Sequence, residues 1–268
     1  MSKIGFCFSG EGARGSVQAG ITQSLSQKGI NADLTIGSSS GAICAAGYSY
    51  LNPAGLSNLW AGITSLWNVF GLNYRFLWNT GILNQKPSEK YISAALKNTP
   101  ICEAVVSRLN SVTGEVEYVS NKEATTADFA EAVLCAYAIP GLVTPRNGYI
   151  DAAFMVESPL EKAIDLGCTE IHVILGSPLS PAPFILPKGF MAFAYMFLRG
   201  LELSLTQLTI LDVLYCLRSA EIPIHVYQPN TCFCSMLDFS KCPAGVEYGL
   251  AGNYIDLTCP MNRVMLPI

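Results

Sequence analysis

The same pattern of hydrophobic and polar residues occurs twice within the first fifty residues. A short apolar, β-favouring run is followed by a glycine- or serine-rich turn, and then by a segment with helical spacing or helix-favouring composition. Gly29 ends the first such segment, and Asn52-Pro53 ends the second. The pattern therefore predicts two strand-turn-helix units, with a strand over 4–8, a helix over 15–28, a strand over 33–37 and a helix over 40–50.

Strand-like and helix-like segments continue to alternate along the rest of the chain. The expected elements are a strand over 115–120, a helix over 126–137, a strand over 149–150 that follows the Asn147-Gly148 turn, strands over 171–175 and 224–227, and a long helical section over 189–217. Such alternation implies an α/β fold with a mainly parallel central sheet that is flanked by helices on both faces. The segment Ala54 to Pro100 holds Trp60, Trp67 and Trp78 without clear periodicity. Its role as helical covering, lid or substrate-facing surface stays open.

Composition agrees with a folded enzyme-sized unit. The 268 residues are 50% hydrophobic and only 13% charged, which supplies enough apolar material for a core on both faces of a sheet. We expect a single domain over 1–268, because compact α/β enzymes often reach this length in one unit. The net charge of −4 comes without a long basic run, which argues against a nucleic-acid partner.

The cysteines and the apolar segments bear on location. Ten cysteines are scattered singly, as in a cytosolic protein, and no paired CxxC spacing with a nearby histidine indicates a zinc site. No metal or cofactor is expected. The first residues lack the features of a secretion signal. Charged residues interrupt the apolar stretch Phe184 to Leu205, which predicts a buried or partly covered helix, with a membrane-docking surface as the alternative.

The strongest chemical motif is Gly37-Ser38-Ser39-Ser40-Gly41. It is a G-x-S-x-G pattern between a predicted strand and a predicted helix, where a sharp turn exposes the central hydroxyl. The following helix N-terminus supplies N–H groups and a favourable dipole for a developing anion. A non-catalytic turn rich in serine and glycine is the alternative for the pentapeptide alone. Its context favours Ser39 as a nucleophile, with Gly37 and Gly41 forming the elbow.

Two further segments carry candidate groups. Gly10-Glu11-Gly12-Ala13-Arg14-Gly15 follows the first strand and superficially meets the dinucleotide-binding rule, but Asp33 precedes its strand and cannot reach a ribose at the strand's end. Backbone N–H groups aimed at an oxyanion are the other use of such a loop. Asp151 follows an apolar strand and precedes two alanines, so it is either a turn former or a catalytic acid.

Together, the three segments resemble the patatin-like phospholipase family in order and spacing. That family combines a glycine-rich oxyanion loop, a G-x-S-x-G elbow and a later Asp-Gly-Gly or Asp-Gly-Ala. Ala138-Ile139-Pro140 and Ser158-Pro159-Leu160 resemble two further stretches of the family, so the resemblance covers Ile4 to Leu160. It implies a three-layer α/β/α fold, a phospholipid or acylglycerol substrate, and a cytoplasmic protein with peripheral contact to a membrane or lipid droplet.

The resemblance also implies roles for individual residues. Ser39 would be the nucleophile of a Ser-Asp dyad and Asp151 its general base. The backbone of Gly10, Glu11 and Gly12 would form the oxyanion hole, with Arg14 and Gly15 supporting the loop. Two residues depart from the family pattern, since Glu11 stands where many members have glycine and Ala152 replaces the glycine after the aspartate. Alanine would be strained at that position if a positive φ were required.

Three alternatives remain. A Ser-Asp-His triad could use His225, although His225 and the only other histidine, His172, lie in apolar strand-like runs where a structural imidazole is expected. A nucleotide-binding module would use the loop from Gly10 to Gly15. A catalytically impaired lipid-binding protein would keep the scaffold, with Ala152 as its defect.

Overall fold

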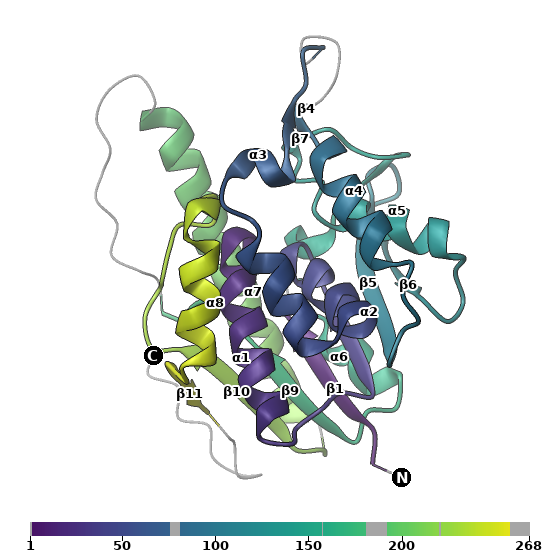
Figure 1. Ribbon diagram of the computed structural model, residues 1–268, viewed down its shortest axis with the longest axis vertical. Helices are drawn as coiled ribbons and strands as arrows, with labels where there is room; N and C mark the ends of the chain where they lie inside the picture. Colours follow the sequence, from purple (N-terminus) through teal and green to yellow (C-terminus); the bar gives the residue numbers. More distant parts are fainter. Residues whose placement is uncertain (1, 76–80, 157, 181–191, 220, 258–268) are drawn as a thin grey trace.

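The structure is a computed structural model that describes residues 2–75, 81–156, 158–180, 192–219 and 221–257 (Figure 1). Its centre is one mixed sheet. In spatial order the strands are β11 (Tyr254–Asp256), β10 (Ile224–Pro229), β9 (Glu170–Ile174), β1 (Ile4–Phe8), β2 (Leu34–Gly37), β5 (Glu103–Asn110) and β6 (Val116–Ser120), and β8 (Tyr149–Asp151) also pairs with β5. The five strands from β10 to β5 run parallel, while β11, β6 and β8 are antiparallel to their neighbours. The prediction of a mainly parallel sheet is confirmed.

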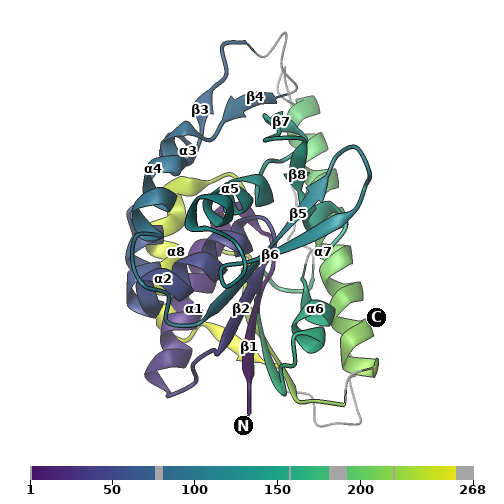
Figure 2. The same ribbon diagram turned by 90° about the vertical axis from the view of Figure 1, so that its right-hand side faces the viewer.

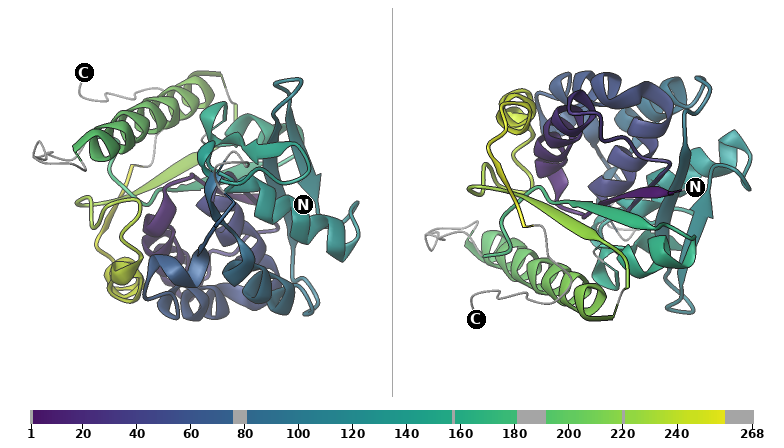
Figure 3. Two further views of the ribbon diagram at one scale, coloured as in Figure 1. Left: turned by 90° about the horizontal axis from the view of Figure 1, so that it is seen from above. Right: turned by 90° about the horizontal axis from the view of Figure 1, so that it is seen from below.

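Helices cover both faces of this sheet, because successive side chains of each strand point to opposite faces. Along β1, Phe6 and Phe8 pack into one buried cluster and Cys7 packs into the other. The first face carries α1 (Gly15–Gln27), α2 (Ser40–Ala61), α5 (Thr126–Ala136) and α8 (Cys242–Leu250), and the second carries α6 (Leu160–Asp165) and α7 (Ala192–Ser219). Figures 2 and 3 show the three layers, which confirm the α/β/α fold.

The second predicted helix continues beyond its expected end. Asn52 has φ 62° and ψ 173°, so the helix breaks before Pro53 as the sequence indicates, but a second helical segment follows within α2. It brings Trp60 into the core, where the indole packs against Gly15. Trp60 therefore belongs to the helical covering, whereas Trp67 is exposed and Trp78 lies outside the described residues.

The rest of the segment 54–100 builds a projection near the carboxyl ends of the parallel strands. Its elements are α3 (Leu66–Val69), β3 (Gly71–Leu72), β4 (Gly81–Asn84) and α4 (Lys86–Ala95). The strands β3 and β4 form a small second sheet with β7 (Gly141–Val143). Figure 1 shows β4 and β7 at the end of the molecule opposite the N-terminus, which is the end toward which β1 runs.

The helix α7 lies across the second face and is only partly covered. Within it, Arg199–Arg218 is long and apolar enough to cross a membrane by length and composition, and 22% of this window is buried inside the structure. The part of the apolar stretch that precedes α7 lies outside the described residues. The nine cysteines in the described ranges are all free thiols.

Candidate active site

Ser39 occupies a sharp turn between the end of β2 and the start of α2. Its φ of 51° and ψ of −127° are unusual for a residue with a side chain, and they place it at the N-cap of α2. Such strain at one serine is typical of a nucleophile elbow, in which the turn projects the hydroxyl beyond the strand. The side chain is 7% exposed, so it is sheltered without being wholly enclosed.

The flanking glycines are required by backbone packing. A Cβ on Gly37 would lie 2.1 Å from the Gly41 carbonyl oxygen, and a Cβ on Gly41 would lie 2.3 Å from that of Phe8. Neither contact is sterically allowed, so both positions of the elbow exclude a side chain. The glycines of the motif thus let the helix start close to the ends of β1 and β2.

Asp151 is the last residue of β8, and it reaches Ser39 directly. The Ser39 hydroxyl donates a hydrogen bond to Asp151 Oδ2 across 2.6 Å, and the Ala153 N–H donates to Oδ1 across 2.9 Å. Burial raises the pKa of Asp151 to about 7, against the smaller lowering effects of these two hydrogen bonds. The strand that holds Asp151 is fixed by its pairing with β5 and by a hydrogen bond from the Asp151 N–H to the Ala138 carbonyl.

Ala152 fits the turn that follows Asp151. The residue begins a short 3₁₀ helix, η2 (Ala152–Phe154), and it is not among the described residues with positive φ. Ala152 therefore does not have the positive φ that would strain an alanine. A Cβ on Gly10 would come within 3.2 Å of the Ala153 Cβ, so the small side chains after Asp151 allow the glycine-rich loop to approach.

The glycine-rich loop packs directly on Ser39. A Cβ on Gly10 would lie 2.6 Å from the Ser39 Cβ, and one on Gly12, which has φ +61°, would lie 2.2 Å from the Met236 carbonyl oxygen. The Glu11 N–H donates to Ser40 Oγ across 2.9 Å. Ser40, which sequence reasoning placed only within the elbow, thus links the loop to the start of α2.

The Glu11 side chain is buried and accepts several hydrogen bonds that hold the loop. Its carboxylate accepts hydrogen bonds from Ser9 Oγ at 2.6 Å, from the Gly176 N–H at 2.7 Å, and from Ser177 Oγ. These contacts tie the loop to the segment after β9. Gly176 and Ser177 carry no sequence signal of this role, because only the parallel pairing of β9 with β1 brings them to the loop.

Arg14 anchors the far side of the same loop. Arg14 is buried, and its guanidinium donates to the Cys234 carbonyl across 2.7 Å and pairs with Glu202 of α7. Glu202 also pairs with Arg199. Gly15 begins α1, where a Cβ would lie 2.4 Å from the Trp60 ring. Both residues thus contact elements that hold the loop in place.

A small cavity lies beside the loop, between Gly10, Leu175 and Leu205. Its volume is about 20 Å³, and Glu11, Arg14 and Glu202 also line it. A cavity of this size accommodates about one water molecule.

The two histidines do not approach Ser39 or Asp151. His172 lies opposite Phe6 in the middle of the sheet, and both imidazoles instead contact Glu170. Their positions are toward the amino ends of β9 and β10, whereas Ser39 follows the carboxyl end of β2. The geometry therefore gives no support to a Ser-Asp-His triad.

The chain is similar in sequence to a family of known proteins. A family model described as patatin-like phospholipase matches residues 6–164, which is more than half of the chain and includes Ser39 and Asp151. No curated protein sequence matches the chain. The crystal structure of VipD from Legionella pneumophila aligns over 96% of this chain and 68% of its own, at 11% identity and a TM-score of 0.44. On the family match, the chain belongs to the patatin-like phospholipase family, a family of lipid hydrolases.

Proposed function

We propose that the protein is a lipid acyl hydrolase that cleaves carboxylic esters of phospholipids or acylglycerols through a Ser39-Asp151 dyad. The observation that carries the proposal is the 2.6 Å hydrogen bond from the Ser39 hydroxyl to the buried carboxylate of Asp151. A nucleophile needs a base within hydrogen-bond reach, and here that base is in direct contact without an intervening histidine. The strained turn at Ser39 supports the same role.

The chemistry proceeds in two halves. Asp151 accepts the Ser39 proton as Oγ attacks the ester carbonyl carbon, and the resulting oxyanion collapses as the alcohol leaves with the proton held by Asp151. Water then attacks the acyl-enzyme while Asp151 accepts its proton. Asp151 passes that proton to the departing Ser39 Oγ, which releases the fatty acid and restores both residues. A pKa of about 7 makes Asp151 a far better base than an ordinary aspartate, because it lies near neutral pH.

The loop from Gly10 to Gly12 is the proposed oxyanion hole. Since the Glu11 N–H already donates to Ser40 Oγ, the amides of Gly10 and Gly12 are the better candidates to receive the oxyanion. The N-terminus of α2 adds a favourable dipole at Ser39. Losing one such donor typically raises the barrier by about 3–4 kcal/mol.

The substrate class follows from the family and is part of the proposal. Members of the family act on lipids, so a glycerophospholipid or neutral acylglycerol is expected, with peripheral contact to a membrane or lipid droplet. Trp60 is buried against Gly15 and is unsuited to contact an acyl chain. A cytoplasmic location remains an expectation.

Two other functions are less well supported. A nucleotide would have to place its phosphates on a loop whose centre holds the acidic Glu11 side chain. An impaired lipid-binding protein was motivated by strain at Ala152, but this residue has no positive φ. The nucleotide-binding alternative does not explain the direct contact between Ser39 and Asp151.

The test is fatty-acid release from mixed phospholipid micelles and from a short-chain aryl ester. Ser39→Ala and Asp151→Asn should abolish turnover at equal folded concentration, while His225→Ala should retain it. Stable wild-type protein that hydrolyses no ester would favour the impaired lipid-binding protein instead.

A further inference from the structure

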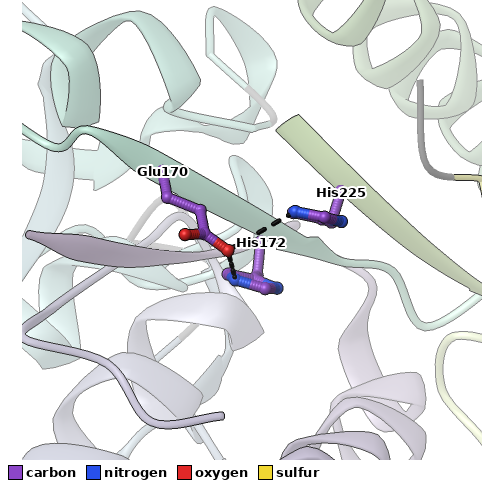
Figure 4. Close-up of side chains that lie close together, drawn as sticks. All are labelled: Glu170, His172 and His225. Atoms are coloured by element: carbon purple, nitrogen blue, oxygen red, sulfur yellow. Dashed lines mark hydrogen bonds and ion pairs between the residues drawn. The ribbon is translucent and has the colours of Figure 1, made fainter. Parts of the chain in front are cut away.

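A cluster of three metal-ligating side chains lies far along the sheet from Ser39, and the proposed hydrolysis does not use it. Glu170 and His172 are two residues apart on β9, so their side chains point to the same face. His225 of β10 is the registered neighbour of His172 and shares that face. Figure 4 shows the three side chains turned toward one another. We propose that Glu170, His172 and His225 bind a single divalent cation of the zinc type.

The distances are close to those that one ion requires. Glu170 Oε1 lies 3.0 Å from His172 Nε2 and 3.4 Å from His225 Nε2, and the three ligand atoms all fall within 4.8 Å of one another. Ligand atoms bound tetrahedrally to zinc at about 2.0–2.2 Å are separated by roughly 3.3–3.5 Å. Two of the separations thus come close to this range. Because the two imidazole planes are stacked 11° apart, the His225 ring would have to turn out of the stack for its Nε2 lone pair to point at the same ion as that of His172.

The donor set also fits this class of ion. Two imidazoles and one carboxylate are a common three-residue set for zinc, with water completing the coordination. Calcium and magnesium prefer sites built of oxygen ligands, so they are disfavoured here. His172 is buried, whereas Glu170 and His225 are partly exposed, so an ion can reach the cluster from solvent.

The surroundings of His172 support the assignment. Tyr227 Oη lies 3.0 Å from His172 Nδ1, so a hydrogen bond at Nδ1 leaves Nε2 directed toward Glu170. A polar partner on the second nitrogen is typical of a metal-ligating histidine, because it fixes the ring orientation and tautomer. The ring of His172 is further held between Phe6 and the stacked ring of His225.

Neighbouring charge favours a cation at this face. Asp256 of β11 pairs with Tyr227, so this acidic residue lies on the face that also carries His225. An ion bound here would join β9 to β10 near their amino ends. The expected role is to stabilise the sheet, since the cluster is remote from the carboxyl strand ends that lead to Ser39.

The sequence offered little indication of this cluster. Its cysteine spacings predicted no zinc site, and each histidine by itself is indistinguishable from a structural residue. Glu170 and His172 are separated from His225 by more than fifty residues, and they converge only through the parallel register of β9 and β10.

Calorimetric titration of zinc chloride into the chelator-treated full-length protein tests the proposal. One Zn²⁺ should bind per chain, and Glu170→Gln and His225→Ala should each weaken binding at least about tenfold. Tyr227→Phe tests the positioning of His172 and should weaken binding by a smaller factor. Glu115→Gln, in the exposed turn between β5 and β6, is the matched control and should bind as the wild type does. Circular dichroism establishes that each variant is folded.

Spectroscopy separates this site from the free thiols. Cobalt bound at the cluster should give tetrahedral d–d bands without a thiolate-to-cobalt charge-transfer band. Because the chain has only two histidines, imidazole nitrogen NMR should show Zn²⁺ shifting Nε2 of both. Absence of binding, binding that the Glu170 and His225 variants leave unchanged, or a thiolate band would each overturn the proposal.

Discussion

The Ser39 hydroxyl donates a 2.6 Å hydrogen bond to Asp151 Oδ2, although the two residues are 112 positions apart in the chain. The contact joins the turn after β2 to the end of β8, and β5 pairs with both strands. β2 and β8 pair with the same edge of β5, with β8 beyond the end of β2, and this arrangement brings Asp151 next to Ser39. Burial raises the pKa of Asp151 to about 7.

The raised pKa of Asp151 predicts the pH dependence of turnover. Only the deprotonated carboxylate can accept the Ser39 proton, so kcat/KM should fall about tenfold per pH unit below about pH 7 and level off above it. A pH profile measured with a neutral aryl ester reports this ionisation. A profile that stays level down to pH 5 would contradict the role given to Asp151.

The same shift predicts that Asp151 reduces stability at neutral pH. Between the ordinary carboxyl pKa and about 7, the unfolded chain has released a proton that the folded protein retains, so the free energy of unfolding falls as pH rises. A shift of about three units corresponds to about 4 kcal/mol as an upper limit. Asp151→Asn should therefore gain stability over wild type between pH 4 and pH 8 in urea denaturation. If the free energy of unfolding depends on pH in the same way in both proteins, burial does not raise the pKa of Asp151.

Gly10→Ala should inactivate the protein through a steric clash. The new Cβ would lie 2.6 Å from the Ser39 Cβ and 3.1 Å from the Ser38 carbonyl oxygen, which forces the loop away from the nucleophile. Turnover should fall by about 10²- to 10³-fold, the range seen when an oxyanion donor is lost. Gly200→Ala in α7 is the control, because nothing lies within 4 Å of its added Cβ. It should keep full activity and gain up to about 1 kcal/mol of stability.

Glu11→Ala should disturb the loop from its other side. The substitution removes the acceptor of the Gly176 N–H and of two serine hydroxyls. A buried donor without a partner costs about 1–3 kcal/mol, so the melting temperature should drop, and kcat should fall more than KM rises. Glu115→Ala, at an exposed turn, should change neither. Equal kcat in both variants would show that the carboxylate does not position the loop.

The elements near the site could be predicted because their signals are local. The strand over 4–8 and the turns at Ser39 and Asp151 lie where the pattern places them, because glycines, apolar runs and turn residues act over a few positions. The strand β5 gave no clear signal, since Ser107 and Arg108 interrupt its apolar run. In the structure Ser107 bonds Ser38 and Arg108 pairs with Glu117, so long-range partners satisfy these polar groups.

Long-range contacts also account for what the sequence missed at the site. Ser40 reaches Glu11 across 29 positions, and Ser177 reaches it across 166. Neither contact produces a pattern of residues that can be recognised in the sequence. The sequence shows that Glu11 stands where many members of the family have glycine. It does not show which residues surround the Glu11 carboxylate, because the fold brings those residues together.

Covalent labelling by a fluorophosphonate tests whether Ser39 is a nucleophile that Asp151 activates. Mass spectrometry of the folded wild type should show one adduct per chain, on the peptide that contains Ser39. Ser39→Ala should remain unlabelled, and Asp151→Asn should react at least about 100-fold more slowly. Folded wild-type protein that takes up no label, or that is labelled at another residue while Ser39→Ala reacts equally, would show that Ser39 is not an activated nucleophile.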